Sequence, residues 1–347
     1  MDVKLVMHVP GASGYHRDES LGFPIHYIAG PSRLRAATFF YFDRRRIAKF
    51  VRRLDPDIIH AHGTEDSFVI AAQAVGRPYV VTAQGMFSQI NHVMPPRLAS
   101  RARVVEFVER RSLARAKHII AKSDYVADWI RLTYPHLAIH RIPNTFDPRI
   151  MEVPLDGQRQ PSSLAFVGNI DPRKGLHLLA EALKNQPLAT RHSPLVTLHI
   201  FGNRGSGASD YEKSTINSLR SIIGDRLALH GVVPAADLPR HVAACELLVA
   251  PSIEEMFGNQ VIEALLVGTW PVVSSGTAME ENVRKIGAGT LFKNGNASDL
   301  ARGILDAQDK IKAWNREETR LRVDQWLGPS KVASLHLSLY CKILDEG

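Results

Sequence analysis

The stretch from Leu247 to Thr277 constrains the fold of this chain more than any other. It contains two short apolar runs, Leu247–Ala250 and Pro271–Val273, separated by an amphipathic segment at about Gly258–Val267. Two buried strands that flank one helix make a βαβ unit, which requires a parallel sheet. A tight turn at Gly268 would join the helix to the second strand. The sequence therefore predicts an α/β fold built on parallel strands.

Two glutamates in this stretch are candidates for a binding site. Glu255 lies in the loop before the predicted helix, and Glu263 lies inside the helix among apolar residues. Sheets of this kind bind ligands at the carboxyl ends of their strands, and both side chains can face that edge. Because an unpaired carboxylate is costly in apolar surroundings, Glu263 needs a partner, which the hydroxyl groups of a bound ribose would supply. Pairing with the helix dipole is the alternative explanation for Glu255.

The start of the predicted helix offers a second kind of contact. The first-turn N–H groups of a helix have no partner within the helix, and here they belong to the segment Phe257, Gly258 and Asn259. Such groups bind anions or hydroxyl groups. We therefore expect them to contribute to the same site as the two glutamates.

The order of residues in this stretch resembles the donor-site signature of the retaining glycosyltransferases of family 4. The family pattern is PS, then E-x-F-G, E-A, a glycine and P-V-V. In this chain it stands as Pro251-Ser252, Glu255-Met256-Phe257-Gly258, Glu263-Ala264, Gly268 and Pro271-Val272-Val273. The resemblance implies the GT-B fold, in which two Rossmann-like, doubly wound α/β domains face each other across a cleft and a C-terminal helix crosses back to the first domain.

Strand-like and helix-like segments alternate along the whole chain, which predicts doubly wound sheets. The expected strands are Lys4–Val9, Phe23–Ala29, Asp57–Gly63, Tyr79–Thr82, His118–Ala121, His140–Ile142, Leu164–Val167, Val196–Phe201 and Leu227–His230. The expected helices are Phe39–Leu54, Thr64–Val75, Pro96–Arg115, Asp124–Tyr134, Leu176–Leu183, Leu238–Ala244 and a terminal segment, Val323–Ile343. The polar segment Met151–Pro161 is the predicted linker. We expect an acceptor-side domain over residues 1–150, a nucleotide-sugar domain over residues 151–325 and a returning helix over residues 326–347.

The opening of the chain departs from the family pattern. Family members begin with a strand and a glycine-rich loop, whereas Asp2–Val9 resembles their second strand. We therefore expect the first βα unit to be missing or reduced. Because that loop ordinarily approaches the donor phosphates and the acceptor, this departure bears on activity.

The segment Gly168–Gly175, GNIDPRKG, resembles the phosphate clamp of the family, written GR…KG. A nucleoside diphosphate leaving group needs positive charge, which Lys or Arg supply without a metal. Lys174 matches the family lysine, but Asn169 stands where the family has an arginine. Arg173 either compensates for that loss or faces solvent.

The resemblance also implies a role for each candidate residue. Glu255 and Lys174 would be the catalytic residues, with Glu255 binding sugar hydroxyl groups and Glu263 binding the ribose. The donor-binding set would comprise Glu263, Gly258, Phe257, Asn259, Arg173, Asn169, Gly168, Gly202, Asn203, Gly231 and Val232. We expect no metal and no cofactor, with a nucleoside diphosphate sugar of the UDP or GDP type as co-substrate.

The acceptor side is expected to lie in the first domain. Gln84 occupies the place where the family often has a histidine, and glutamine cannot act as a base. In the mechanism usually proposed for this fold, the departing phosphate deprotonates the acceptor on the front face. His60 and His62 follow a strand and either serve the acceptor or are ordinary loop histidines.

The positive charge of the chain is concentrated in its first half. Residues 1–155 hold 22 Lys and Arg against 14 Asp and Glu, whereas residues 156–347 hold 21 of each. Such a bias suggests an anionic partner, which could be a membrane surface, a lipid-phosphate acceptor or nucleic acid. Nucleic acid ranks last, because few aromatic residues are interleaved with the basic ones.

Two further features bear on the location of the protein. Cys245 and Cys341 lie far apart in apolar surroundings, which predicts buried free thiols in a reducing compartment. No apolar run is long enough to span a membrane, and the first residues do not resemble a signal peptide. We expect a cytoplasmic protein, peripheral on the inner face of the membrane.

The resulting hypothesis is a retaining glycosyltransferase that moves a sugar to a polysaccharide, lipopolysaccharide or lipid-linked acceptor of the cell envelope. A non-catalytic or impaired nucleotide-sugar-binding protein is the first alternative, because of Asn169, Gln84 and the short N-terminus. A GT-B epimerase acting on a UDP-sugar is the second. The sugar, the base, the acceptor and the linkage stay open.

Overall fold

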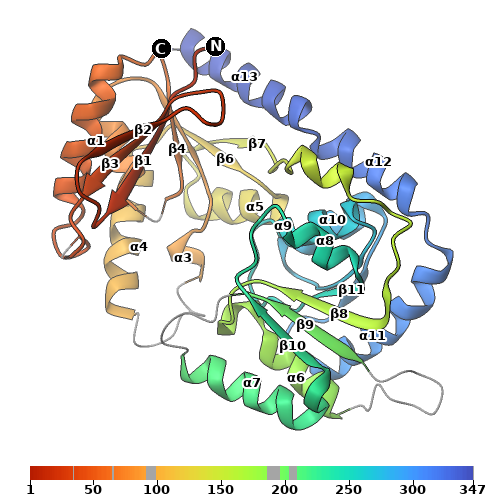
Figure 1. The fold of residues 1–347 in the computed structure, drawn as a ribbon. Helices are drawn as coiled ribbons and strands as arrows, with labels where there is room; N and C mark the ends of the chain where they lie inside the picture. The colour runs from red at the N-terminus through yellow and green to blue at the C-terminus, as the bar shows by residue number, and fades with distance from the viewer. Residues whose placement is uncertain (34, 65, 91–98, 186–195, 203–208, 347) are drawn as a thin grey trace. The chain divides into compact units, whose positions relative to one another are not determined.

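The computed structural model describes residues 1–33, 35–64, 66–90, 99–185, 196–202 and 209–346, which form two compact units (Figure 1). Unit 1 comprises Met1–Lys122, Val126–Ile142 and Leu335–Gly347, and unit 2 comprises Ser123–Tyr125 and Pro143–Ser334. The main boundaries between the units follow residues 142 and 334. The sequence analysis predicted domain boundaries after residues 150 and 325.

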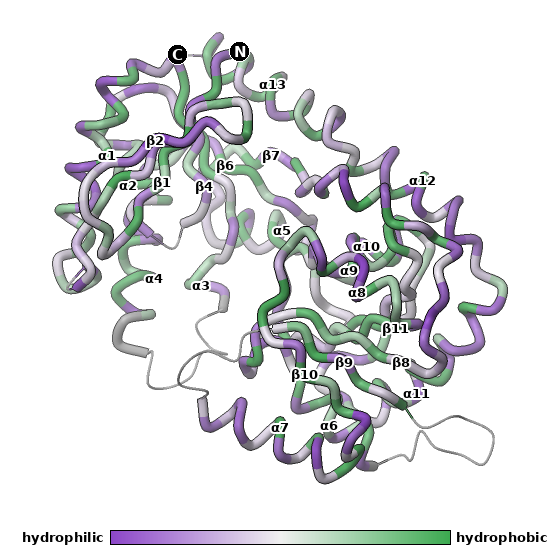
Figure 2. Tube along the Cα trace, in the orientation of Figure 1, coloured by the Kyte–Doolittle hydropathy of each residue, from purple (hydrophilic) through white to green (hydrophobic). Residues whose placement is uncertain are grey.

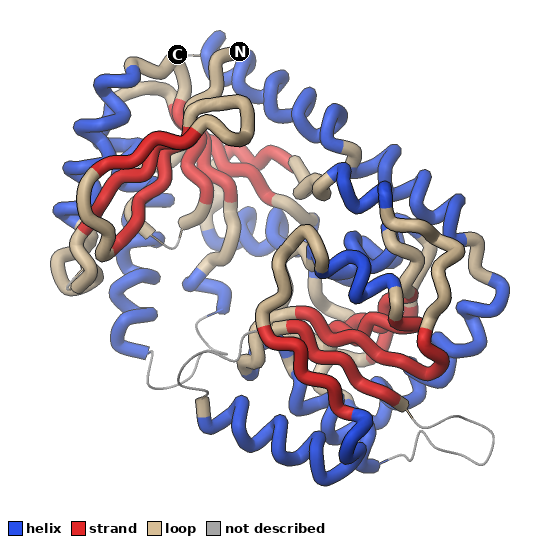
Figure 3. The backbone as a smooth tube through the Cα atoms, viewed as in Figure 1, coloured by secondary structure: helices blue, strands red, loops and turns tan. Residues whose placement is uncertain are grey.

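Unit 2 is built on one parallel sheet. Its strands are β8 (Gln160–Val167), β9 (Thr197–Phe201), β10 (Leu227–Gly231), β11 (Cys245–Ala250), β12 (Trp270–Ser274) and β13 (Thr290–Phe292). The strands lie side by side in one sheet, drawn in red in Figure 3. They are hydrogen-bonded in the order β10-β9-β8-β11-β12-β13, and the five pairings between neighbours are all parallel. Counted within the unit this is 3-2-1-4-5-6, the Rossmann order, whose direction reverses between β8 and β11.

Helices cover both faces of this sheet, as a doubly wound fold requires (Figure 1). α6, α7 and α11 pack on one face, and α8, α9, α10 and α12 group on the other. Their bounds are α6 Leu176–Asn185, α7 Asp210–Ile223, α8 Leu238–Ala243, α9 Asn259–Leu266, α10 Ala278–Ile286, α11 Ala297–Lys310 and α12 Arg316–Leu327. The last helix, α13 (Pro329–Asp345), includes residues of both units. Short 3₁₀ turns occur at η3 Pro148–Glu152, η4 Pro172–Lys174, η5 Gly224–Arg226 and η6 Ile311–Ala313.

The core of unit 2 follows from the composition of its strands. β11 and β12 are apolar almost throughout and are buried on both faces, which is typical of a parallel sheet between two helix layers (Figure 2). The predicted βαβ unit is confirmed, with α9 beginning one residue after Gly258, whose φ of 85° is left-handed. Gly268, at φ 76°, turns the chain into β12 as expected.

Unit 1 contains two sheets. β4 (Ile59–His62), β5 (Tyr79–Thr82), β6 (His118–Ala121) and β7 (Ala138–Arg141) form a parallel sheet in that order. β1 (Leu5–Pro10) pairs in parallel with β3 (Ile25–Gly30), which pairs antiparallel with β2 (Tyr15–Asp18). The helices are α1 Tyr41–Leu54, α2 Phe68–Val75, α3 Phe87–Ile90, α4 Ala99–Leu113 and α5 Asp124–Thr133.

Several details differ from the sequence-based expectations. Over residues 5–30 the chain passes from β1 through the unpredicted strand β2 to β3, and the first helix follows only at Tyr41. Both cysteines are free, but the prediction that both are buried is wrong, because Cys341 is exposed. Its neighbours Leu339 and Ile343 are buried, and a residue two positions along a helix points to the opposite side. Among the described residues, no helix has the length and apolar character that crossing a bilayer would need.

Candidate functional site

The candidate site of unit 2 lies at the switch point of the sheet. β8 and β11 are neighbours there, and both strands run toward the same edge. The turn η4 follows β8, and the loop of residues 251–258, here called the β11 loop, follows β11. Ligands of doubly wound sheets bind at this position because the chain leaves the two strands in opposite directions.

The η4 turn is shaped so that it can approach the β11 loop closely. The Asp171 carboxylate accepts a hydrogen bond of 3.1 Å from the Lys174 backbone N–H. Gly175 ends the turn at φ 70°, and a Cβ atom at this position would lie 1.9 Å from the carbonyl oxygen of Pro251. Only glycine fits both the left-handed backbone and this approach. The turn therefore presents Lys174 directly to the loop.

Lys174 and Glu255 form an ion pair at the switch point. The Lys174 Nζ lies 2.6 Å from a Glu255 carboxylate oxygen, and the two side chains are only 14% and 13% exposed. Burial alone would raise the pKa of Glu255, but the neighbouring Lys174 ammonium group, with Arg173 farther away, holds it below the ordinary value. The site thus favours the ionised carboxylate of Glu255 beside Lys174, where the sequence predicted the catalytic residues.

The β11 loop is fixed by hydrogen bonds to its backbone. Each carbonyl oxygen from residue 252 to residue 257 accepts a bond from a different donor, and five of the six donors are side chains. The donor–acceptor pairs are Ser274–Ser252, Asn294–Ile253, Arg173–Glu254, the backbone N–H of Ala278 to Glu255, Ser123–Met256 and Asn282–Phe257. A loop held at every carbonyl is preorganised, and it positions the Glu255 side chain accordingly.

Glu263 is placed differently from Glu255. It lies about one turn into α9, and neither a hydrogen bond nor an ion pair of its carboxylate occurs within the described residues. Burial, followed by the nearby Asp147 carboxylate, raises the pKa of Glu263 to about 7. Asp147 was not predicted as a site residue. The sequence analysis could have found it, because it lies five residues after the end of the predicted strand His140–Ile142 and close to the domain boundary. A half-buried carboxyl group that has no partner among the described residues favours a ligand that supplies one.

Four other predicted donor-side residues lie in or next to the β11 loop and in the η4 turn. Gly258 and Phe257 are buried parts of the β11 loop, while the exposed Asn259 side chain accepts a bond of 2.8 Å from Asn144. Arg173 was predicted either to compensate for Asn169 or to face solvent. It is half-buried and donates a hydrogen bond of 3.2 Å to the Glu254 carbonyl.

The glycines of the predicted pocket lie at neighbouring strand ends. A Cβ atom at Gly202 would lie 1.9 Å from the Gly168 carbonyl oxygen, so these two strand ends touch. Gly231 at φ 69° accepts a bond of 2.9 Å from the Gly202 N–H, and Val232 beyond it is 75% exposed. Asn169 is exposed, and Asn203 lies outside the described residues.

The predicted acceptor-side residues belong to unit 1. His60 is half-buried, and its two ring nitrogens each lie 2.6 Å from a hydroxyl group, those of Tyr340 and Thr82. Burial, followed by the neighbouring His62 ring, lowers the pKa of His60 to about 2. This environment favours the structural explanation for His60. His62 and Gln84 are exposed, and Gln84 accepts a hydrogen bond from Lys122.

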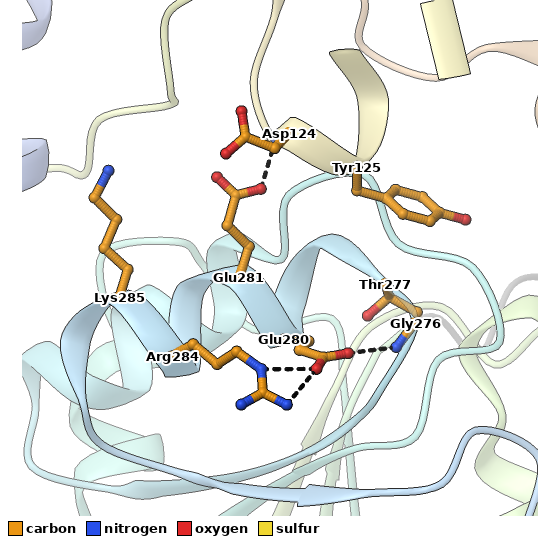
Figure 4. Close-up of a pocket in the computed structure, with 8 residues that line it drawn as sticks. All are labelled: Asp124, Tyr125, Gly276, Thr277, Glu280, Glu281, Arg284 and Lys285. Atoms are coloured by element: carbon orange, nitrogen blue, oxygen red, sulfur yellow. Dashed lines mark hydrogen bonds and ion pairs between the residues drawn. The ribbon is translucent and has the colours of Figure 1, made fainter. Parts of the chain in front are cut away.

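A shallow pocket of about 560 Å³ lies beside the β11 loop (Figure 4). It is lined by Asp124, Tyr125, Gly276, Thr277, Glu280, Glu281, Arg284 and Lys285. Its acidic groups are engaged, since Glu280 bonds Arg284 and the Gly276 N–H, and Glu281 accepts from the Asp124 N–H at 2.6 Å. None of these residues was predicted, because no sequence pattern links residues 124–125 to residues 276–285.

A Rossmann-type sheet with an ion pair at its switch point is typical of doubly wound α/β proteins that bind ligands there. Two family models match the chain: "Glycosyltransferase Family 4" over residues 1–149 and "Glycosyl transferases group 1" over residues 161–309. The chain belongs to the family-4 glycosyltransferases, which have the GT-B fold.

Individual proteins show the same relationship. The chain is 27% identical over 322 residues to the 2-deoxystreptamine glucosyltransferase of Streptomyces kanamyceticus, covering 86% of this chain and 80% of that protein. The solved structure of sucrose-phosphate synthase from Thermosynechococcus elongatus aligns with a TM-score of 0.80 at 19% identity, covering 100% and 90% of the two chains. Anabaena HepE in complex with UDP-glucose aligns with a TM-score of 0.71 at 19% identity, covering 95% and 88%. The two-domain Rossmann-like fold expected from the sequence is thereby confirmed.

Proposed function

We propose that this glycosyltransferase transfers a sugar from a nucleoside diphosphate sugar to a glycan or lipid-linked acceptor of the cell envelope, with retention of configuration and without a metal. The observation that carries the proposal is the buried Lys174–Glu255 pair at the switch point of the unit 2 sheet. A lysine held there supplies positive charge for a leaving diphosphate, and the carboxylate beside it suits sugar hydroxyl groups.

Each candidate residue then has a distinct task. Lys174 pairs with the diphosphate, while Arg173 already holds the Glu254 carbonyl and so supports the site mainly through the loop. Glu255 binds the sugar and stabilises positive charge that develops at its anomeric carbon. Glu263 accepts hydrogen bonds from the ribose hydroxyl groups, which supply the partner that its carboxyl group lacks among the described residues.

Transfer to the acceptor requires a base that removes the proton of its hydroxyl group. The predicted acceptor-side residues of unit 1 are poorly suited to this task. Both ring nitrogens of His60 are engaged, and the amide of Gln84 does not take up protons. We therefore assign the proton to the departing phosphate oxygen. The bond from the anomeric carbon to that oxygen breaks, and a bond to the acceptor oxygen forms on the same face.

The similar proteins support the class of donor. HepE is named in complex with UDP-glucose, and the Streptomyces protein is named as a glucosyltransferase. A UDP-linked hexose is therefore the first donor to test, with GDP-linked hexoses second.

A surface of unit 1 supports the proposed membrane partner. The side chains of Phe39, Phe42 and Phe107 are 53%, 54% and 53% exposed, and that of Tyr41 is 43% exposed. The Phe39 and Phe107 rings lie 5.8 Å apart, and the Tyr41 and Phe42 rings lie 5.4 Å apart. We call these four residues the aromatic surface. It joins the start of α1 to α4.

Cations surround the aromatic surface. The guanidinium carbon of Arg45 lies 5.7 Å from the centre of the Tyr41 ring, and α1 continues with further exposed basic residues. Phe39 has a left-handed backbone at φ 49°, which is strained for a phenylalanine and directs its side chain to solvent. Exposed aromatic rings among arginines have the composition of a segment that inserts into an anionic lipid interface.

Turnover with a panel of UDP-, GDP- and ADP-sugars tests the proposed function. We expect one donor to be consumed, product sugar to keep the anomeric configuration of the donor, and EDTA to leave the rate unchanged. Binding without transfer or donor hydrolysis would favour the nucleotide-sugar-binding alternative. Conversion of a UDP-sugar without any acceptor to its epimer would favour the epimerase.

A further inference from the structure

Two residues of a short segment far away in the sequence, Ser123 and Tyr125, form hydrogen bonds with the β11 loop. The segment Ser123–Tyr125 groups with unit 2, although the residues on either side of it, up to Lys122 and from Val126, group with unit 1. More than 120 positions separate it from the loop along the chain. No sequence pattern predicts this contact.

The segment holds the loop on both sides of Glu255. The buried Ser123 hydroxyl donates a hydrogen bond of 2.8 Å to the Met256 carbonyl. The Tyr125 hydroxyl donates a bond of 2.5 Å to the Glu254 carboxylate. The residues immediately before and after Glu255 are therefore both bonded to one short segment.

The segment is itself anchored. The Glu281 carboxylate on α10 accepts a bond of 2.6 Å from the Asp124 N–H at the start of α5 (Figure 4). The Tyr125 ring points away from Glu281 in this view, which leaves its hydroxyl group for Glu254. A carboxylate at the first turn of a helix also interacts favourably with the helix dipole.

We infer that Ser123 and Tyr125 are positioning residues for Glu255. They fix the backbone beside Glu255 so that its carboxylate meets Lys174 at 2.6 Å and, on the proposed function, meets the donor sugar at the same place. Small displacements of a reacting group reduce rates strongly, whereas they affect the binding of the remainder of a substrate much less. The two hydroxyl groups should therefore act on kcat more than on the donor KM.

The test compares Ser123→Ala, Tyr125→Phe and the double variant with two controls. Tyr79→Phe removes a hydrogen-bonded hydroxyl group in unit 1, and Ser334→Ala removes one that bonds only within its own helix, to the Ser330 carbonyl. We expect the double variant to lose kcat by roughly tenfold, since it lacks one charged and one neutral hydrogen bond, with the donor KM within about twofold. Both controls should match the wild type.

A second measurement does not depend on turnover. The Ala278 N–H bonds the Glu255 carbonyl, and the Ile253 N–H bonds the Arg173 carbonyl. Hydrogen exchange at these two amides should be faster in the double variant and unchanged in the controls. In addition, Tyr125→Phe should have no further effect on kcat in a Glu254→Ala background, because its acceptor is then absent.

Unchanged exchange and a kcat within twofold of wild type would overturn the inference. Loss of kcat without faster exchange would also overturn it, because the hydroxyl groups would then act in another way. If the wild type turns over none of the donors, the proposed function fails by itself, and the exchange measurement still decides whether Ser123 and Tyr125 position the loop.

Discussion

The environment of the Glu263 carboxyl group is unfavourable for the stability of the fold but suits a bound ligand. In the fold the carboxyl group is half-buried near Asp147, so its pKa is raised from 4.5 to about 7. Ionising it in the folded chain is therefore more costly than ionising it in the unfolded chain. A residue that serves only the fold would have a partner or be replaced, which is why we assign it to a ligand.

This assignment predicts a pH dependence of stability. The unfolded chain releases the Glu263 proton near pH 4.5 and the folded chain near pH 7, so stability falls as the pH rises between these values. The full difference corresponds to roughly 3 kcal/mol at most. We expect Glu263→Gln to raise the free energy of unfolding relative to wild type at pH 8 but not at pH 4, as measured by urea denaturation. An equal effect at both pH values would contradict the raised pKa.

At this scale the sequence predicted three candidate side chains but not the residues that hold them in place. Lys174, Glu255 and Glu263 were found because they lie at fixed distances from glycines and strand ends. Ser123 and Tyr125 were not predicted, because hydrogen bonds across more than 120 positions of the chain follow from tertiary packing. Such bonds leave no periodic signal in the sequence.

At the scale of elements, the site depends on how closely the η4 turn approaches the β11 loop. Gly175→Ala would place a Cβ atom 1.9 Å from the Pro251 carbonyl, and its φ of 70° is unfavourable for alanine. The clash is with backbone, so the turn and Lys174 must move.

Gly76→Ala is the matched control for this substitution. Gly76 also ends a helical segment in the left-handed region, at φ 84°, but no atom lies within 4 Å of a Cβ placed there. We expect Gly76→Ala to cost about 1 kcal/mol of stability from backbone strain, and Gly175→Ala to cost more than about 3 kcal/mol and to abolish activity. Equal losses in thermal or urea unfolding would show that the turn tolerates displacement.

Two helices that the sequence analysis did not assign, α7 and α10, have recognisable start signals in the sequence. α7 begins after Ser209 with Glu212 three residues later, and α10 begins after Thr277 with Glu280 three residues later. Both are capping-box patterns, and the Ser209 and Thr277 side chains do accept first-turn N–H groups. β2 has no such signal, since Tyr15–Asp18 is exposed and lacks an apolar alternation.

At the scale of the whole molecule, the charge bias predicts that binding to an anionic membrane depends on salt concentration. The excess of basic residues lies in residues 1–155, which also carry the aromatic surface. We expect sedimentation with vesicles of anionic lipid to decrease steeply as salt rises, because the Debye length shrinks from about 10 Å at 0.1 M to about 3 Å at 1 M.

The aromatic surface gives this prediction a residue-level control. Phe42→Ser with Phe107→Ser should weaken vesicle binding by roughly tenfold, since two partly exposed rings no longer enter the lipid. Leu132→Ser removes a side chain that is 85% exposed elsewhere in unit 1 and should have no effect. Binding that is insensitive to salt and to the double substitution would remove the membrane from the proposal.

The central claim is that a nucleoside diphosphate sugar binds at Lys174, Glu255 and Glu263, and calorimetric titration of the nucleoside diphosphate that binds wild type most tightly tests it most directly. We predict that Lys174→Met and Glu263→Ala each weaken binding at least roughly tenfold, through the loss of a charge-assisted contact. Glu181→Ala and Lys184→Met, exposed on α6, should leave the affinity unchanged. Wild-type affinity in both site variants would contradict the account.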